Sequence, residues 1–405
     1  MKRFFTIPAM AAVMTAGVAC FLALVSAPAS AQREAVFNGH RIIYPESSIP
    51  KIGHLHTNYF YVDSDQPSAG PNPGDETPGS VACVYQLVSG PTGCPIATST
   101  TVPSGGIGAI AIVDAGYYPT AQSDLDAFDA QFGIPATTVN QVWQGKTRPP
   151  TYSEWLTEEA LDIEWSHAMA PQAKLFLVVS TLCTTPQCNT DPSWQAVQYA
   201  AQLVAQNGGG VVSMSFGDAE ISQERTFDQY MTQPGVVFFA ASGDSGIGVS
   251  IYPGSSPNVV SVGGTVFNRD RNGNFVSEVY GGGGGDISPY EPRPKYQSGI
   301  AGIVGTKRGY PDVASNYCCA AVYLQGGWLG VGGTSWGSPT FAGIVNAAGS
   351  QMGSTADELT MMYKELAVPS EYAAYFNDIT SGSSKCKTGW DECAGIGSPK
   401  TYAGK

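Results

Sequence analysis

Short apolar runs alternate with stretches of helical period between residues 107 and 241 of this 405-residue chain. The run 107–113 contains no polar side chain, which is typical of a strand that is buried on both faces. The predicted strands are 107–113, 138–143, 174–180, 211–215 and 236–241, and the predicted helices are 121–132, 153–170, 193–206 and 221–231. Such alternation predicts an α/β fold, in which a doubly wound, mostly parallel sheet carries helices on both faces.

The first 31 residues have the pattern of a secretory signal peptide. Lys2 and Arg3 precede an apolar run, and the run ends in the small residues Ala29, Ser30 and Ala31. No later stretch reaches the ~18 uninterrupted apolar residues that a membrane-spanning helix needs. We therefore predict a secreted protein, extracellular or periplasmic, that has no membrane partner.

The region that follows the signal peptide shows little periodicity. Residues 32–80 are polar and rich in proline, and residues 66–79 are predicted to be an exposed loop or linker. Further along, residues 259–267 and 275–280 flank a polar turn and are predicted to form a hairpin. The glycine run 281–285 is predicted to be a flexible wall or hinge, because no Lys-Ser/Thr pair follows it to make a phosphate loop.

Charge excludes one class of partner. The formal net charge is −13 for the whole chain and −15 once Lys2 and Arg3 are removed. With so few basic residues the chain is not expected to bind nucleic acid. An excess of carboxylates suits a protein that works in acid, where many of them are neutral, although neutral secreted proteins share this composition.

Eight cysteines remain after removal of the signal peptide, an even number that favours disulfides over metal ligation in an exported chain. Three pairs would close short local loops, namely Cys83 with Cys94, Cys183 with Cys188, and Cys386 with Cys393. Cys318 and Cys319 are then left to each other or to a rearranged set.

The segment 331–343, VGGTSWGSPTFAG, brings one serine to the start of a predicted helix. At that place the hydroxyl of Ser335 would lie beside unpaired backbone N–H groups and the positive end of the helix dipole. A nucleophile benefits from this setting, because the same N–H groups can hold the oxyanion that forms when it attacks a carbonyl. An isolated Gly-Thr-Ser turn more often only caps a helix, so the partners of Ser335 decide its role.

Histidine is the usual base for a catalytic serine, but none is well placed here. His167 lies in the predicted helix 153–170, and it is about 140° around that helix from Asp162 and about 180° from Glu158. The other histidines of the mature chain, His40, His54 and His56, lie in the polar N-terminal segment.

Glu158 and Asp162 stand at positions i and i+4, so they share one face of the predicted helix. The spacing alone favours a solvated face. If the pair turns inward instead, both carboxyls cannot ionise easily, one pKa rises, and the two share a proton. Such a pair can accept the proton of a serine when the solvent is acidic.

The segment 240–246, AASGDSG, directly follows a predicted buried strand. Parallel strands present functional residues at their carboxyl ends, so Asp244 is expected to point into a crevice. An ionised Asp244 would repel a nascent oxyanion, whereas a protonated one could donate a hydrogen bond to it. The alternative is an Asx-type turn at a strand end.

The chain resembles the sedolisins in four blocks taken together. They are residues 158–162 (EEALD, continuing to APQA at 170–173), 213–217 (SMSFG), 242–246 (SGDSG) and 332–335 (GGTS). Sedolisins are serine-carboxyl peptidases (peptidase family S53) of subtilisin-like fold, and the resemblance spans residues 106–399. It implies that Ser335 is the nucleophile, Glu158 its base, Asp162 the acid that supports Glu158, and Asp244 the oxyanion donor. It also implies an endopeptidase that hydrolyses protein or peptide substrates at acidic pH. We expect this enzyme to be a monomer.

The resemblance extends to three C-terminal blocks, 378–382 (DITSG), 389–391 (GWD) and 395–397 (GIG). In sedolisins the loop that contains these blocks holds one calcium ion. The implied Ca²⁺ ligands are the side chains of Asp378 and Asp391 and the carbonyls of Ile379, Lys387 and Gly389. Oxygen ligands of this kind suit calcium. The family usually has glycine where Lys387 stands.

The resemblance implies a peptidase domain at 106–405, preceded by an N-terminal extension and the start of the catalytic domain at 32–105. The family normally carries a long folded prosegment, and residues 32–105 are too short for one. We therefore expect either maturation without it or a different control of activation. Phe216 replaces a tryptophan that is frequent in the family, which would reshape a substrate subsite.

Two other hypotheses remain open. A neutral subtilisin-type protease would use Ser335, a histidine and Asp114, whose Val-Asp-Ala-Gly context resembles the aspartate turn of that family. No His-Gly-Thr-His segment follows, however, and Asp244 stands where that family would have asparagine. The second hypothesis is a non-catalytic, secreted calcium-binding or adhesion module on a protease fold. All four expected catalytic positions are filled, which argues against this hypothesis.

Overall fold

The structure is a computed structural model that describes residues 33–182, except 38 and 52, and residues 192–405. The predicted signal peptide and the predicted Cys183–Cys188 bridge lie outside these residues. Within the described part of the chain, no helix is both long enough and apolar enough to span a membrane.

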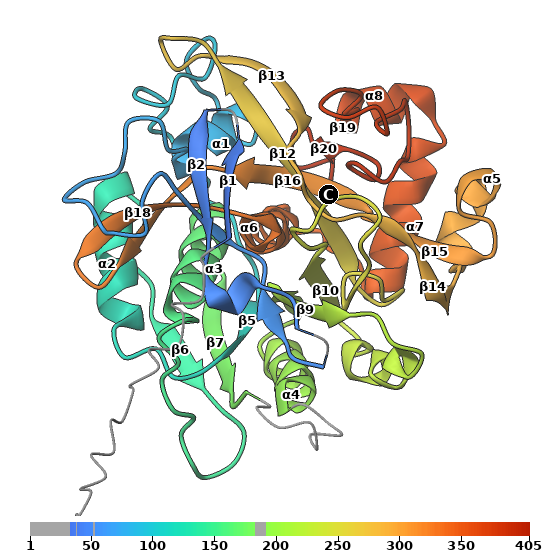
Figure 1. Cartoon of the computed structure of the whole chain (residues 1–405), viewed down its shortest axis with the longest axis horizontal. Coiled ribbons are helices and arrows are strands. Elements are labelled where there is room, and N and C mark those ends of the chain that lie inside the picture. The colour runs from blue at the N-terminus through green and yellow to red at the C-terminus, as the bar shows by residue number, and fades with distance from the viewer. Residues whose placement is uncertain (1–32, 38, 52, 183–191) are drawn as a thin grey trace, which may run out of the picture. The chain divides into compact units, whose positions relative to one another are not determined.

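An eight-stranded, mostly parallel sheet organises the chain (Figure 1). Its strands are β5 (Ala109–Ala115), β6 (Val139–Val142), β7 (Lys174–Ser180), β8 (Gly210–Met214), β10 (Val236–Ala241), β12 (Val260–Arg269), β13 (Phe275–Tyr280) and β16 (Val313–Cys318). Their order is β13-β12-β10-β8-β5-β7-β6, and β16 pairs with β12. Within this sheet β12 and β13 are antiparallel, as the predicted hairpin requires, and the other described pairs are parallel.

Helices cover both faces of this sheet, which confirms the predicted α/β class. The larger helices are α2 (Ala121–Phe132), α3 (Leu156–Met169), α4 (Pro192–Gln206), α6 (Thr334–Ala347) and α7 (Thr355–Leu366), and the shorter ones are α1 (Pro78–Val84), α5 (Ala301–Val304) and α8 (Pro369–Tyr375). Side chains of β5 alternate between the faces. Ile110 and Ile112 pack in the core that contains α3 and α6, whereas Ala111 and Val113 pack in the core that contains α4.

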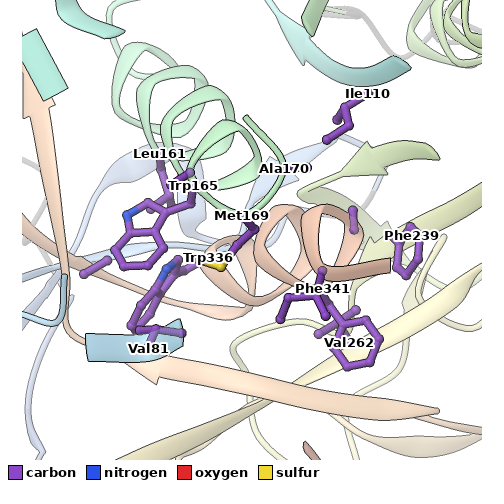
Figure 2. Packing of buried hydrophobic residues seen from close by; sticks show 14 of the residues in the cluster. Val81, Ile110, Leu161, Trp165, Met169, Ala170, Phe239, Val262, Trp336 and Phe341 are labelled. Carbon is purple, nitrogen blue, oxygen red and sulfur yellow. The ribbon is translucent and has the colours of Figure 1, made fainter. Parts of the chain in front are cut away.

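The contact between α3 and α6 is the part of the core that positions the site. Figure 2 shows Trp165 and Met169 of α3 lying toward α6, where Trp165 meets Trp336, whereas Phe341 of α6 lies beside Phe239 of β10. The rings of Trp165 and Trp336 meet edge to face with their centroids 4.8 Å apart, a favourable geometry for aromatic pairs. Because Trp336 directly follows Ser335, this packing fixes the start of α6 relative to α3.

Smaller sheets complete the fold. A five-stranded antiparallel sheet has the order β1-β2-β4-β18-β17, and a three-stranded sheet has the order β11-β9-β3. Their strands are β1 (Arg33–Phe37), β2 (His40–Tyr44), β3 (His56–Thr57), β4 (Phe60–Val62), β9 (Phe216–Ala219), β11 (Ile251–Tyr252), β17 (Ala320–Leu324) and β18 (Gly327–Gly332). The remaining pairs are β14 (Asp286–Pro292) with β15 (Lys307–Tyr310) and β19 (Phe376–Asn377) with β20 (Ser398–Pro399).

The predicted helix 221–231 is wrong. The segment forms two short 3-10 turns, Glu224–Thr226 and Asp228–Met231. Two local interactions compete with a continuous helix. The carboxylate of Glu224 accepts a hydrogen bond from the N–H of Ile221, and the ring of Phe227 stacks on Trp194 of α4 at 5.1 Å. Tertiary contacts therefore override the helical tendency of this segment.

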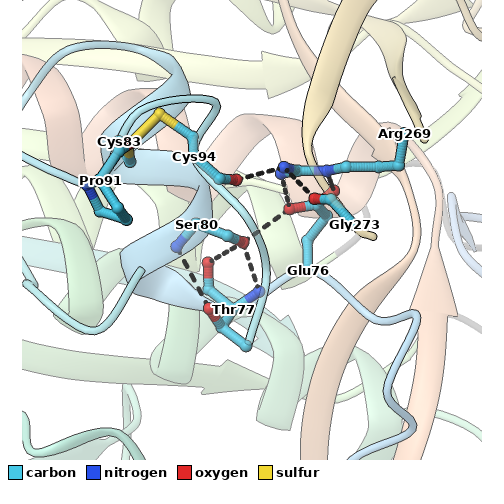
Figure 3. Close-up of a disulfide and its surroundings, with 8 residues drawn as sticks. All are labelled: Glu76, Thr77, Ser80, Cys83, Pro91, Cys94, Arg269 and Gly273. Atoms are coloured by element: carbon cyan, nitrogen blue, oxygen red, sulfur yellow. Dashed lines mark hydrogen bonds and ion pairs between the residues drawn. A yellow bond between two sulfur atoms is a disulfide. The ribbon is translucent and has the colours of Figure 1, made fainter. Parts of the chain in front are cut away.

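The N-terminal region is part of the fold, because residues 33–62 supply three strands of the five-stranded sheet. Residues 66–74 are an irregular, largely exposed stretch, as predicted, but the end of the predicted loop 66–79 is not exposed: Glu76 is buried and α1 begins at Pro78. The carboxylate of Glu76 forms an ion pair of 2.5 Å with Arg269 and also accepts from Ser80 at 2.6 Å (Figure 3). The alternation rule missed these elements because the strands are short and their partners β17 and β18 are distant in sequence.

The glycine run 281–285 is closely packed and is not a hinge. A Cβ on Gly284 would stand 2.2 Å from the carbonyl oxygen of Ser242, and one on Gly285 would stand 2.0 Å from that of Glu392. The glycines are there because neighbouring backbone segments approach too closely for any side chain.

Three of the predicted disulfides are confirmed, Cys83–Cys94, Cys318–Cys319 and Cys386–Cys393. The first of them closes the loop after α1, whose Cys94 carbonyl accepts a hydrogen bond from Arg269 (Figure 3).

Candidate active site

Ser335 lies in the first turn of α6, as its sequence context predicts. The chain enters the helix through Gly333, whose φ of +128° is a conformation that residues with a side chain rarely adopt. Ser335 is 0% exposed. Its hydroxyl donates to the carbonyl oxygen of Ser215 at 3.0 Å and accepts from the backbone N–H of Asn58 at 3.1 Å.

Glu158 and Asp162 turn inward from α3, and both are 0% exposed. The solvated face that the spacing alone favours is therefore wrong for this pair. The carboxylate of Asp162 accepts from the hydroxyl of Ser215 at 2.9 Å, and that hydroxyl also lies 3.2 Å from the carbonyl oxygen of Ser335. Ser215, which directly follows β8, thus connects Asp162 to the start of α6.

Burial raises the pKa of Glu158 well above its ordinary value, and the charges of Asp162 and Asp114 raise it further. The hydroxyl of Ser335 is close enough to oppose this rise, although it donates to Ser215 and neither carboxylate oxygen of Glu158 has a hydrogen-bond partner in the described structure. Burial likewise raises the pKa of Asp162, again with a contribution from Asp114. These groups are therefore held largely protonated at a pH where exposed carboxyls are ionised.

Two further carboxyls belong to this cluster, and they were not predicted from the sequence as members of it. Glu159 neighbours Glu158 on α3, and Asp114 lies near the end of β5; they are 0% and 1% exposed. Burial raises both pKa values. Among the described residues, none of the ion pairs involves these four acids. The position of Asp114 at the carboxyl end of a parallel strand is the signal that could have identified it.

Asp244 follows β10, and its side chain contacts Thr334, the residue before Ser335. One carboxylate oxygen accepts from the N–H and the hydroxyl of Thr334 at 2.8 and 2.9 Å. The other oxygen is buried and has no partner in the described structure. Burial raises the pKa of Asp244 to about 7, although the Thr334 donors oppose the rise. In acid the free oxygen of this carboxyl therefore carries a proton.

No described hydrogen bond joins Ser335 to a histidine. His167 is buried on the other side of α3, with Nε2 2.9 Å from the carbonyl oxygen of Pro135 and 3.3 Å from the carboxylate of Asp129. His56 is buried too, and its Nδ1 lies 3.0 Å from the carbonyl oxygen of Thr57. The predicted orientation of His167 away from the acid pair is consistent with this arrangement.

The two carboxyls among the predicted calcium ligands, Asp378 and Asp391, lie near one another in the C-terminal loop. Asp391 is oriented by backbone N–H groups of Lys387, Cys393 and Ala394. Asp378 accepts from the N–H of Gly389 at 3.2 Å. Burial raises the pKa of Asp391, and the charge of Asp378 adds to the rise, so the two acids are near one another.

This donor set fits a cation. Neither Asp378 nor Asp391 forms an ion pair in the described part of the chain, and the ammonium of Lys387 turns to the carbonyl of Ser384 instead. Two close carboxylates without a cationic side chain provide hard oxygen ligands of the kind that calcium prefers.

Comparison with known proteins gives consistent matches. The model of the subtilase family matches residues 156–346. Kumamolisin from Bacillus sp. (strain MN-32) is 29% identical over 366 residues, which cover 80% of this chain and 62% of that protein. Sedolisin from Pseudomonas sp. (strain 101) is 27% identical over 367 residues, which cover 78% of this chain and 58% of that protein.

A solved structure of Pseudomonas sedolisin, described as a serine-carboxyl proteinase complexed with two molecules of pseudo-iodotyrostatin, shares the fold. It has a TM-score of 0.64 and 23% identity, and the match covers 80% of this chain and 95% of that chain. The chain spans 62%, 46% and 48% of the lengths of the first three curated relatives that it matches. Its subtilisin-like fold and these relatives support the assignment of the chain to the sedolisin family.

Proposed function

We propose that this protein is a secreted serine-carboxyl endopeptidase that hydrolyses peptide bonds at acidic pH. The observation that carries the proposal is the buried cluster of Glu158, Asp162 and Asp114 around Ser335, where no histidine is hydrogen-bonded to the serine. Its substrates would be proteins or peptides, and it would act as a monomer. The signal-like N-terminus supports export.

In this mechanism the Ser335 hydroxyl attacks the carbonyl carbon of the substrate and passes its proton to Glu158. Asp162 supports Glu158 and is held by Ser215. The N–H of Ser335 and a protonated Asp244 donate hydrogen bonds to the oxyanion. Glu158 then returns the proton to the leaving amine, and water hydrolyses the acyl ester in the reverse sequence.

The alkaline limit of the expected pH range follows from the sign of the pKa shift of Asp244. Glu158 must be ionised to accept a proton while its neighbours stay protonated, because several charges in one buried site are costly. As the pH rises through about 7, Asp244 loses the proton with which it donates to the oxyanion. Activity is therefore expected to disappear toward neutral pH.

A pH series tests this proposal. Calcium-loaded protein, first incubated in acid, is assayed against a denatured protein from about pH 2 to about pH 8, with Ser335→Ala as the blank. We expect a bell-shaped profile confined to acid. An optimum near neutral pH would favour the subtilisin-type alternative, and no hydrolysis at any pH would leave the non-catalytic module.

We also propose that one calcium ion is held by the side chains of Asp378 and Asp391 and the carbonyls of Ile379, Lys387 and Gly389. When bound, the ion would neutralise the two carboxylates and reduce the freedom of the loop. This loop contacts the core, because the indole N–H of Trp390 donates to the carbonyl of Pro311 at 3.0 Å.

Removal of calcium is therefore expected to lower the thermal midpoint of unfolding. A ligand present at about 100 times its Kd stabilises the folded state by about 2.7 kcal/mol, which corresponds to several degrees in a domain of this size. Calorimetry with calcium and with a chelator measures the shift. Asp391→Asn should abolish the difference, and Asp357→Asn, an exposed N-terminal residue of α7, should retain it; equal midpoints in wild type would contradict the site.

A further inference from the structure

Two adjacent cysteines form a disulfide at the corner where the chain passes from one sheet to another. Cys318 is the last residue of β16 in the main sheet, and β17 of the five-stranded sheet begins at Ala320. The bridge joins Cys318 to Cys319, whereas the other two described bridges span 11 and 7 positions. The stabilisation that a disulfide gives to the folded state falls as its loop shortens. This bridge closes the shortest loop possible, so it acts mainly on its immediate surroundings.

The Cys318–Cys319 bridge lines a cavity of about 600 Å³, which lies within the size range of small-molecule sites. The four proposed catalytic residues lie outside this cavity. Its lining is partly apolar and partly charged, and includes Phe37, Glu76, Arg269, Asp270 and Arg271. The two arginines and the two acids balance in charge. The cavity therefore repels neither a neutral nor an anionic small molecule.

Both cysteines of the bridge keep some contact with solvent. Cys318 is 6% exposed and Cys319 is 8% exposed, in contrast to Cys393 at 0%. On their inner side they pack in one apolar cluster with Phe60 and Tyr317. The side of the bridge that remains open is therefore the side that lines the cavity, and a small molecule in the cavity can contact the sulfur atoms.

The residue before the bridge holds the start of α6. The carbonyl oxygen of Tyr317 accepts from the N–H of Gly333 at 2.8 Å. A Cβ on Gly332 would stand 2.6 Å from the same oxygen, so the two backbones are in close contact. Gly333 is the N-cap of α6 and lies two residues before Ser335. Because packed interiors transmit displacement, a movement of Cys318 would reach Gly333 through the carbonyl of Tyr317.

We propose that Cys318–Cys319 is a site of thiol exchange, where a low-molecular-mass thiol that enters the cavity opens the bridge and thereby loosens the start of α6. A thiolate attacks one sulfur of the bridge, the S–S bond breaks, and the other sulfur leaves as a thiolate that takes a proton from water. A second thiolate then attacks the outer sulfur of the mixed disulfide and releases the remaining cysteine. In sum, two small thiols are oxidised to one disulfide, and the bridge is reduced to two cysteine thiols.

Opening the bridge changes the space that the corner needs. The two sulfur atoms move from a covalent bond length to van der Waals separation, although both side chains are more than nine-tenths buried. The carbonyl of Tyr317 then shifts relative to the N–H of Gly333. We expect faster exchange of this amide with solvent, and a lower kcat, because a small misplacement of a nucleophile lowers the rate. The effect on kcat rests on the proposed peptidase, whereas the opening of the bridge and the amide exchange do not.

The test treats the full-length protein with 2-mercaptoethanol at about pH 8, where the thiolate is well populated. After removal of the thiol, N-ethylmaleimide traps free cysteines, and peptide mass mapping locates them. We expect Cys318 and Cys319 to be trapped while the circular dichroism stays native. Hydrogen exchange of the peptide that contains Gly333, followed on Ser335→Ala to prevent self-digestion, should become faster. In wild type, kcat in acid should fall at least about 5-fold and should return when oxidised 2-mercaptoethanol closes the bridge.

Two double variants make the test specific. Cys318→Ser with Cys319→Ser should show the lowered kcat at the outset and no further response to the thiol. Cys386→Ser with Cys393→Ser, outside the cavity, should keep the response. Trapping of other cysteines while Cys318 and Cys319 stay bridged would overturn the exchange site.

The remaining outcomes separate this proposal from the proposed function. An opened bridge with unchanged amide exchange at Gly333 would overturn the link to α6, and so would an unchanged kcat in a protein that hydrolyses its substrate. If the bridge opens and the Gly333 amide exchanges faster, but no hydrolysis occurs in either state, the peptidase fails and the thiol-exchange site stands.

Discussion

Glu158→Gln is expected to lower kcat by about 10³-fold or more, because a glutamine cannot accept the proton of Ser335. General base catalysis contributes about 10²- to 10⁴-fold in enzymes. KM should change little, since Glu158 faces the serine and its side chain is 0% exposed. Steady-state kinetics on acid-activated protein measure the two constants separately. A variant that retains more than about a tenth of the wild-type kcat would remove Glu158 from the role of base.

The same substitution should stabilise the folded protein at neutral pH. The pKa of Glu158 is raised in the folded state, so the folded carboxyl binds a proton that the unfolded chain releases as the pH rises above its ordinary carboxyl range. Wild type therefore loses stability as the pH rises from about 4 toward neutral. The glutamine variant has no titrating group at position 158 and does not lose this part of its stability. At about pH 3 the two should unfold at similar denaturant concentrations. Glu154→Gln, an exposed neighbour at the start of α3, serves as the control and should change neither kcat nor stability.

Asp244→Ala is expected to lower kcat by about 10²- to 10³-fold, the usual cost of one oxyanion donor. Asp244→Asn should recover part of this loss, because an amide donates a hydrogen bond at any pH. It should also move the alkaline limit of activity upward, since the pKa of about 7 at Asp244 no longer applies. A pH profile of kcat/KM for the three proteins measures the shift.

The matched pair separates donation from packing. Both substitutions remove the carboxylate that binds the N–H of Thr334, but only asparagine can replace the donor and this acceptor together. If Asp244→Asn has the same alkaline limit as wild type, Asp244 is not the oxyanion donor. Ser245→Ala, at an exposed neighbouring position, should leave the profile unchanged.

Local signals were sufficient for the main sheet and for the position of Ser335. The apolar runs that became β5, β7, β8 and β10 lie within one or two residues of their predicted bounds, because a strand buried on both faces needs apolar side chains throughout. The turn before α6 could also be predicted from the sequence, since Gly333 adopts a φ that favours glycine. The segment 221–231 was misread because its contacts with Trp194 and Tyr252 come from distant parts of the chain.

The sequence by itself determined the α/β class, the serine at the start of a buried helix, and the order of the blocks that resemble the sedolisins. Only the tertiary structure decided whether Glu158 and Asp162 face solvent or Ser335, because i and i+4 spacing places two residues on one helix face without saying what covers it. It also decided the place of Asn58, which lies in a polar segment without a motif and reaches Ser335 across 277 positions of the chain. Contacts of that range depend on how whole sheets and helices pack, and no local pattern encodes them.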